Sequence, residues 1–129
     1  MSNDVNVVRG EGKLQHVVEV GPHKLIADAP SQYGGDDAGF TPHDLLAASL
    51  GACTALTLNM YAQRKGFPLQ KVDVKVEHAD KDGGYVFNRH LTFHGDLSAE
   101  QKESLIGIAN KCPIHKILSG QIEILTDAN

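Results

Sequence analysis

A long uncharged segment dominates the pattern of hydrophobic and polar positions. Residues 45–60 contain no charged side chain, and Thr41 and Pro42 come just before them. A threonine at the N-cap can accept a backbone N–H, and proline at the next position loses no donor that the helix needs. Gly66 supplies a stop signal. The pattern therefore predicts a helix over residues 42–65, roughly 36 Å long.

Nearly all faces of this predicted helix are apolar or small, so one small domain has too little chain to cover it. We expect part of the helix to be buried against a second subunit. The uncharged stretch is shorter than the ~18–20 residues that span a bilayer. It also contains Ser49, Thr54 and Asn59, which favour a buried core helix over a membrane span.

Other segments alternate apolar and polar residues in the manner of strands. Three valines at 72, 74 and 76 alternate with charged residues, and the turn-like residues 81–84 lead into a second strand over 85–94. An earlier hairpin is expected over residues 13–28, and a last strand over 121–126.

Two further helices are predicted after the second hairpin. Ser98 and Gln101 match a capping box that begins a helix to about Asn110, and Pro113 begins a short helical turn. Antiparallel hairpins with separately grouped helices predict an α+β fold rather than a doubly wound one. No linker or repeat divides the sequence, so we expect a single domain over residues 1–129.

Composition and charge narrow the classes of function. The formal net charge is −4 and the 12 Lys and Arg residues are scattered, which argues against a nucleic-acid partner. The first residues lack the basic and apolar segments of a signal peptide, so we expect a cytoplasmic protein without a membrane partner. In that compartment a cysteine pair is rarely a permanent disulfide. Cys53 and Cys112 are therefore expected to be catalytic, redox-sensing or inert.

The two cysteines have different predicted surroundings. Cys53 lies near the middle of the long helix, where a cysteine can also be a plain buried apolar residue. Cys112 immediately precedes Pro113, at an N-cap-like place where the helix dipole stabilises a thiolate. Position alone leaves open which cysteine is the more reactive.

Metal and nucleotide motifs are missing from the sequence. The seven histidines include no HExxH pattern, the cysteines form no CxxC pair, and no GxGxxG or P-loop motif occurs. His90 and His94 lie about 13 Å apart along a predicted strand. We therefore expect no metal and no nucleotide cofactor.

The segments around the cysteines occur in a distinctive combination. Residues 40–58, FTPHDLLAASLGACTALTL, are followed by YAQRKG at 61–66; GDLSAEQ at 95–101 is followed by CPIHKIL at 112–118. Together they resemble the two cysteine-bearing segments of the OsmC/Ohr family of osmotically inducible and organic hydroperoxide resistance proteins, in its OsmC-like branch. The resemblance runs from about residue 13 to residue 126.

This resemblance implies both a fold and an activity. The fold is an OsmC-like α+β subunit with antiparallel sheets and a long central cysteine-bearing helix, two copies of which intertwine as a homodimer. The activity is that of an antioxidant, stress-response oxidoreductase, a thiol-dependent peroxidase for organic hydroperoxides. Cys53 would form a sulfenic acid and Cys112 would resolve it to a disulfide, which an external dithiol reduces. Neither a metal nor an organic cofactor is implied.

The chain departs from the family pattern around the first cysteine. Members commonly pair it with an arginine from the N-terminal strands and a glutamate near the start of the long helix. His43 stands at the expected glutamate position, with Asp44 beside it. Arg9 and Lys13 are the nearest candidates for the arginine by order in the chain, whereas Arg89 would qualify only if the fold brought it to Cys53, which the sequence does not show.

Two alternatives follow from the same residues. The departures favour a non-catalytic OsmC-like protein that binds a small apolar ligand. Cys112 and His115, three residues apart on a helical turn, could instead serve a cysteine hydrolase or acyltransferase. That reading lacks an orienting acid and an oxyanion site in the sequence.

Overall fold

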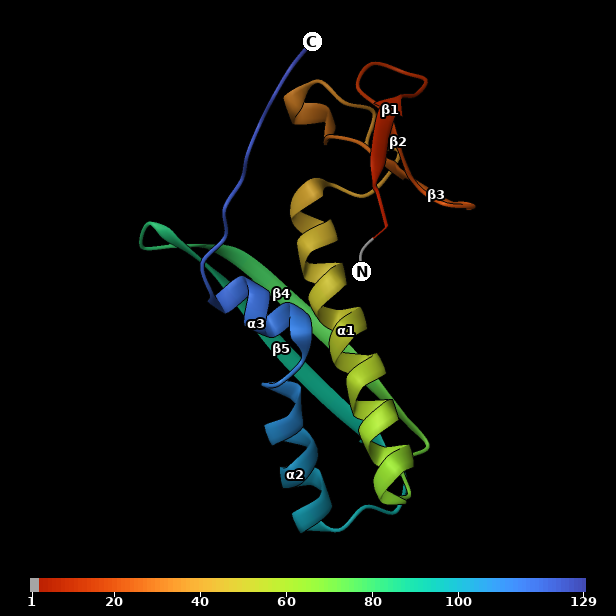
Figure 1. The fold of residues 1–129 in the computed structure, drawn as a ribbon, viewed down its shortest axis with the longest axis vertical. Helices are drawn as coiled ribbons and strands as arrows, with labels where there is room; N and C mark the ends of the chain where they lie inside the picture. Colours follow the sequence, from red (N-terminus) through yellow and green to blue (C-terminus); the bar gives the residue numbers. More distant parts are fainter. Residues whose placement is uncertain (1–2) are drawn as a thin grey trace. The chain divides into compact units, whose positions relative to one another are not determined.

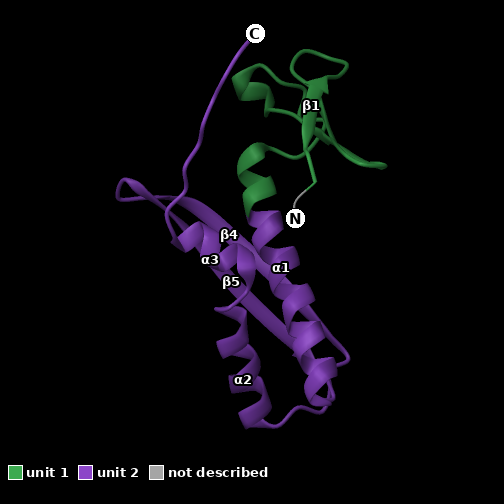
Figure 2. Cartoon of the chain, in the orientation of Figure 1, with its two compact units in different colours: residues 1–46 green, residues 47–129 purple. Residues whose placement is uncertain are grey.

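The computed structural model describes residues 3–129 (Figure 1). Their contacts form two compact units, one ending at Leu46 and the other running from Ala47 to Asn129 (Figure 2). The sheets are antiparallel and the helices are grouped apart from them, which confirms the predicted α+β class. The single domain expected over the whole chain stays a prediction.

The first unit contains a three-stranded antiparallel sheet. Its strands are β1 (Asn6–Arg9), β2 (His16–Val20) and β3 (His23–Ala27), in that order across the sheet. β2 and β3 form the hairpin predicted over residues 13–28. The sequence patterns do not predict β1, which has only 4 residues.

A buried carboxylate organises the loop after β3, which includes the short 3-10 helix η1 (Ser31–Tyr33). Asp28 accepts backbone N–H groups from Ala29 at 2.8 Å, Ala38 at 3.0 Å and Asp36 at 3.3 Å. Hydrogen bonds from Ala38 and Ala29 are the main causes that lower the pKa of Asp28. The loop is therefore held by a charged acceptor.

The second unit is built on a long hairpin of β4 (Lys71–Lys81) and β5 (Gly84–His94). The turn residues Asp82 and Gly83 both have positive φ, as a two-residue type I′ turn requires. Alternate residues of β4 are half-buried, so one face of the hairpin is covered and the other faces solvent.

Three helices complete the fold, and their ends follow the sequence signals. α1 spans Pro42–Lys65, α2 spans Ala99–Ala109 and α3 spans Pro113–Ser119. Thr41 Oγ1 accepts the backbone N–H of Asp44 at 3.1 Å. Ser98 caps α2 in a complete capping box, and Cys112 is the N-cap of α3. All three helix starts were correctly predicted.

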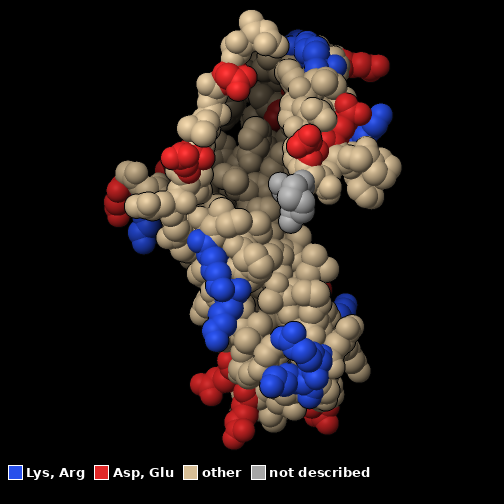
Figure 3. Space-filling view, viewed as in Figure 1, with Lys and Arg blue, Asp and Glu red and all other residues tan. Residues whose placement is uncertain are grey.

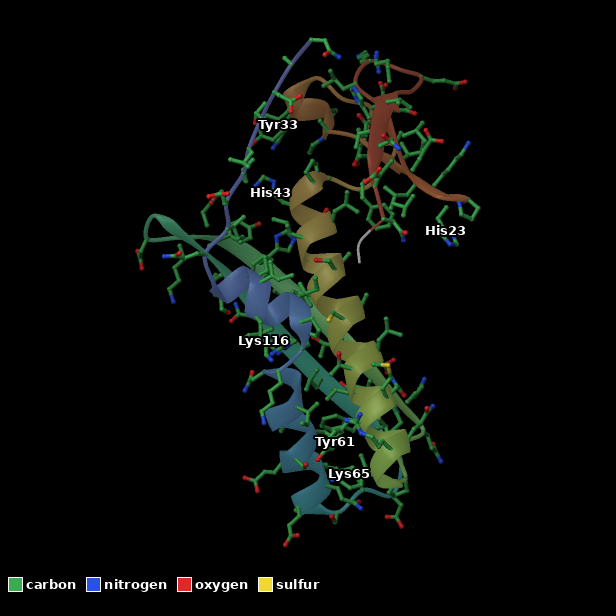
Figure 4. The ribbon with its side chains drawn as sticks, in the orientation of Figure 1. His23, Tyr33, His43, Tyr61, Lys65 and Lys116 are labelled. Carbon is green, nitrogen blue, oxygen red and sulfur yellow. The ribbon has the colours of Figure 1, made fainter. Side chains whose placement is uncertain are left out.

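The core of the second unit lies between α1, α2 and the covered face of the hairpin (Figure 1). Leu58 and Ala62 of α1 meet Leu105 and Ala109 of α2. Half-buried residues surround this cluster: Tyr61, Phe67, Leu69, Val72, Leu91, Phe93, Leu97 and Ile108. The last turns of α1, where Figure 4 labels Tyr61 and Lys65, are therefore fixed against both α2 and the sheet.

The strand predicted over residues 121–126 is wrong. No secondary structure follows Gly120 among the described residues, and Ile122, Ile124 and Leu125 are 59%, 82% and 84% exposed. An alternating apolar pattern becomes a strand only when another strand satisfies its backbone groups. None of the five described strands pairs with this segment.

Part of the long helix is not covered by its own chain. α1 is the one helix in residues 3–129 that is long and apolar enough to cross a membrane by length and composition, with a mean hydropathy of 1.4 over 18 residues. A core helix of a soluble protein meets the same criterion. Its exposed side includes Leu56 at 65% and Met60 at 62% exposure.

On the face shown in Figure 3, charged side chains lie in several places rather than in one region. In the view of Figure 3, Lys and Arg side chains lie in separate small groups, with Asp and Glu side chains near them. On the hairpin, His90 pairs with Glu77 and His94 with Asp73, each at 2.8 Å. Within the described part of the chain, no three His, Cys, Asp or Glu residues are grouped to hold a metal ion.

Candidate active site around the two cysteines

Cys53 and Cys112 come together in the second unit. Cys53 lies in the middle of α1 and is half-buried, whereas Cys112 precedes α3 and is fully buried. Both thiols are free, and the side chain of Cys53 hydrogen-bonds to Cys112. The folded chain thus places the only two cysteines of the sequence in direct contact.

The surroundings of Cys112 favour its thiolate. Burial raises the pKa of this thiol, but hydrogen bonds outweigh the burial and lower the pKa below its ordinary value. The backbone N–H of His115 donates to Sγ at 3.3 Å, and the side chains of Cys53 and Thr54 and the backbone of Ile114 add to the effect. The N-cap position expected from the sequence is therefore confirmed, with the electrostatic consequence that a helix start predicts.

Cys53 is the more accessible of the two sulfurs. It lies on the half-buried side of α1, and its Sγ is 3.9 Å from Thr57 Oγ1, one helical turn further on. A small molecule can therefore approach Cys53 more readily than Cys112, which is 0% exposed.

Arg89 is the cationic group of this site. It stands on β5 opposite Val76, on the covered face of the hairpin. Its guanidinium donates to Thr54 Oγ1 at 3.0 Å, to Asn110 Oδ1 at 3.1 Å and to His115 Nδ1 at 3.1 Å. Because arginine only donates, His115 Nδ1 is the acceptor in this contact.

Thr54 joins Arg89 to the sulfurs, and sequence reasoning missed it. Its side chain is fully buried, donates to the carbonyl of Leu50 at 2.7 Å and lies 4.0 Å from Cys112 Sγ. One signal was available in the sequence: a hydroxyl next to Cys53 on an apolar helix face needs a partner when buried.

The other candidate residues from the sequence lie in the first unit. Arg9 donates to the carbonyls of Gly12 and Lys13 at 2.7 Å and of Gln15 at 2.9 Å, which closes its own loop. His43, labelled in Figure 4, and Asp44 belong to the first turn of α1. Their roles toward Cys53, like that of Lys13, stay predictions.

The arrangement suits redox chemistry between two thiols better than acyl transfer. His115 contacts Cys112 through its backbone N–H, while its ring nitrogen Nδ1 accepts from Arg89. A hydrolase would need that ring to take the proton of the thiol. This geometry therefore gives no support to the Cys112–His115 dyad considered from the sequence.

Comparison with known proteins agrees with the observed fold. A hydroperoxide reductase of Mycoplasma pneumoniae is 26% identical over 99 residues, 70% of each chain. Among solved structures, an OsmC-like protein from Mycoplasma pneumoniae has a TM-score of 0.78 at 23% identity, over 93% of this chain and 89% of that one. An organic hydroperoxide resistance protein from Legionella pneumophila has a TM-score of 0.68 at 22% identity, over 93% and 90%. The family model for OsmC-like proteins matches residues 34–127, so the chain belongs to the OsmC-like protein family.

Proposed function

We propose that this protein is a thiol-dependent peroxidase that reduces organic hydroperoxides and serves antioxidant defence. The observation that carries the proposal is the contact between an accessible Cys53 and a buried Cys112 whose pKa is lowered. The relative named hydroperoxide reductase supports the reaction class.

The first step is attack by Cys53 on the hydroperoxide. Cys53 is the accessible sulfur, so its proton can pass to solvent and its thiolate can attack the hydroperoxide. An S–O bond forms as the O–O bond breaks, and the alkoxide takes up a proton to leave as an alcohol. Cys53 is oxidised to a sulfenic acid and the hydroperoxide is reduced by two electrons.

The second step is closure of the disulfide. The Cys112 thiolate attacks the sulfenic sulfur of Cys53, an S–S bond forms, the S–O bond breaks, and the leaving hydroxide takes up a proton from solvent to become water. An external dithiol then returns two electrons and two protons and is itself oxidised to a disulfide. The cycle needs neither a metal nor an organic cofactor.

The proposal includes a cytoplasmic homodimer. Two free thiols are ordinary in a reducing compartment. Leu56 and Met60 lie on the side of α1 that also carries Cys53, and one chain leaves them mostly exposed. A second copy packed along this side would bury them and place an apolar wall beside the reactive sulfur.

Intact-mass measurement after treatment with cumene hydroperoxide tests the activity. The wild type should lose two hydrogen atoms, Cys112→Ser should gain oxygen instead, and Cys53→Ser should stay unchanged. Wild-type protein that stays unmodified would contradict the proposal. Retention of an apolar ligand together with unmodified thiols would favour the non-catalytic binding protein.

A further inference from the structure

We propose that Arg89 is a positioning residue for Cys112. It sets how fast Cys112 closes the disulfide, not how fast Cys53 reacts with the hydroperoxide. The inference rests on the proposed peroxidase function and adds a residue from β5 to it.

Arg89 ties together three segments that meet at the cysteines. Its contacts reach Thr54 in α1, Asn110 at the end of α2 and His115 in α3, all between 3.0 and 3.1 Å. A guanidinium holds several donors in one rigid plane, whereas a lysine presents a single charged nitrogen on a flexible stem. One arginine therefore fixes the start of α3 relative to α1 in a way that lysine does not reproduce.

The contacts of Arg89 lead to Cys112 on two sides. Thr54 Oγ1, which Arg89 binds, lies 4.0 Å from Cys112 Sγ. His115, whose ring Arg89 binds, donates its backbone N–H to the same sulfur at 3.3 Å. Cys53 is held differently, as part of α1 and beside Thr57. Loss of Arg89 should therefore release Cys112 more than Cys53.

The position of Cys112 decides the fate of an oxidised Cys53. The sulfenic acid either reacts with Cys112, forming a disulfide and water, or with a second hydroperoxide. In that second reaction the sulfur gains another oxygen to become a sulfinic acid, and the hydroperoxide leaves as an alcohol. Slower closure shifts the products from disulfide toward sulfinic acid.

The test compares full-length wild type with Arg89→Lys and Arg89→Gln. Arg64→Gln is the matched control, because it also removes an arginine, one whose guanidinium lies over the Tyr61 ring. Reduced protein is mixed with cumene hydroperoxide, quenched at intervals and resolved by intact mass into thiol, sulfenic, disulfide and sulfinic forms. Disulfide closure should slow about tenfold or more in both Arg89 variants, as expected for loss of charged hydrogen bonds. Loss of the reduced form should stay within about twofold of wild type, and Arg64→Gln should match wild type.

Two results would overturn the inference: unchanged closure in both Arg89 variants, or a fall in the first oxidation step as large as the fall in closure. If Arg89→Gln does not fold, Asn110→Ala and His115→Ala each remove one contact of Arg89, and each should also slow disulfide closure.

Closure driven by diamide separates this inference from the proposed function, because diamide oxidises a thiol pair without a hydroperoxide. A wild type inert to hydroperoxide but with Arg89-dependent closure by diamide would overturn the proposed function alone. Closure that is independent of Arg89 with both oxidants would overturn this inference alone.

Discussion

The backbone N–H of His115 lies 3.3 Å from the sulfur of Cys112 and donates to it. This contact joins the first turn of α3 to a fully buried thiol and helps to lower its pKa against the opposing effect of burial. Thiolate formation in the folded protein is therefore coupled to folding itself.

The coupling predicts how stability changes with pH. The folded state loses the Cys112 proton at lower pH than the unfolded chain, in which an ordinary thiol has a pKa of 9.0. The unfolded state then binds more protons, so stability rises with pH between the folded pKa and about 9. The contribution is lost as pH falls through the folded pKa. Urea unfolding of reduced protein across this range measures it.

Cys112→Ser is the control for that pH dependence. Its hydroxyl does not titrate in this range, so the rise in stability should be smaller than in wild type. Equal slopes in the two proteins would contradict a lowered pKa at Cys112. A thiolate absorbance titration of Cys53→Ala gives a second check, because alanine removes the donor at position 53 and should raise the pKa of Cys112.

The exposed side of α1 predicts a dimer that one charge disrupts. Leu56→Glu removes an apolar side chain that is 65% exposed in the single chain and puts a carboxylate in its place. If a second copy covers this position, the dimer should weaken by at least about tenfold, since a buried leucine contributes about 1.5–3 kcal/mol. Light scattering on a sizing column over a dilution series measures the change. Ile106→Glu is the matched control, because it places the same charge at an exposed apolar residue of α2 instead of α1. A monomeric wild type, or a Leu56→Glu protein that stays dimeric, would contradict this prediction.

Two glycines should respond oppositely to alanine. A Cβ on Gly51 would sit 3.4 Å from Val76 Cγ2, an ordinary contact, so Gly51→Ala should stabilise by about 0.5–1 kcal/mol through helix propensity. A Cβ on Gly39 would clash with the backbone carbonyl of Ile26, so Gly39→Ala should destabilise by about 1–3 kcal/mol. Thermal unfolding of both variants measures whether each substitution raises or lowers stability. A destabilised Gly51→Ala would show that α1 packs more tightly on β4 than this distance indicates.

The lowered pKa of Asp28 predicts that the first unit loses stability in acid. Its pKa is lowered mainly by backbone N–H donors, so its contribution to stability is present above the ordinary value of 3.8 and is lost as pH falls through the lower, folded pKa. The stability difference between wild type and Asp28→Asn should shrink on acidification below 3.8. Urea unfolding over an acid pH series measures it. A difference that does not change with pH would show that the carboxylate charge contributes nothing.

Signals from neighbouring residues were enough to predict the helices and the two hairpins. Thr41, Ser98 and Pro113 mark helix starts because a cap or a fixed φ acts on its own neighbours. The place of Cys112 at the start of α3 followed from the next residue alone. The strand expected over 121–126 failed because pairing depends on a partner that local pattern does not supply.

The sequence by itself determined the helix ends, the strand periodicity, the N-cap place of Cys112 and the two segments that resemble the family. Only the tertiary structure decided that Arg89, not a residue nearby in the chain, meets Thr54 and His115 beside the sulfurs. The physical reason is the range of the interactions. Caps and turns act over a few residues, whereas a site that joins a strand to two helices depends on the register of the hairpin and the packing of its covered face.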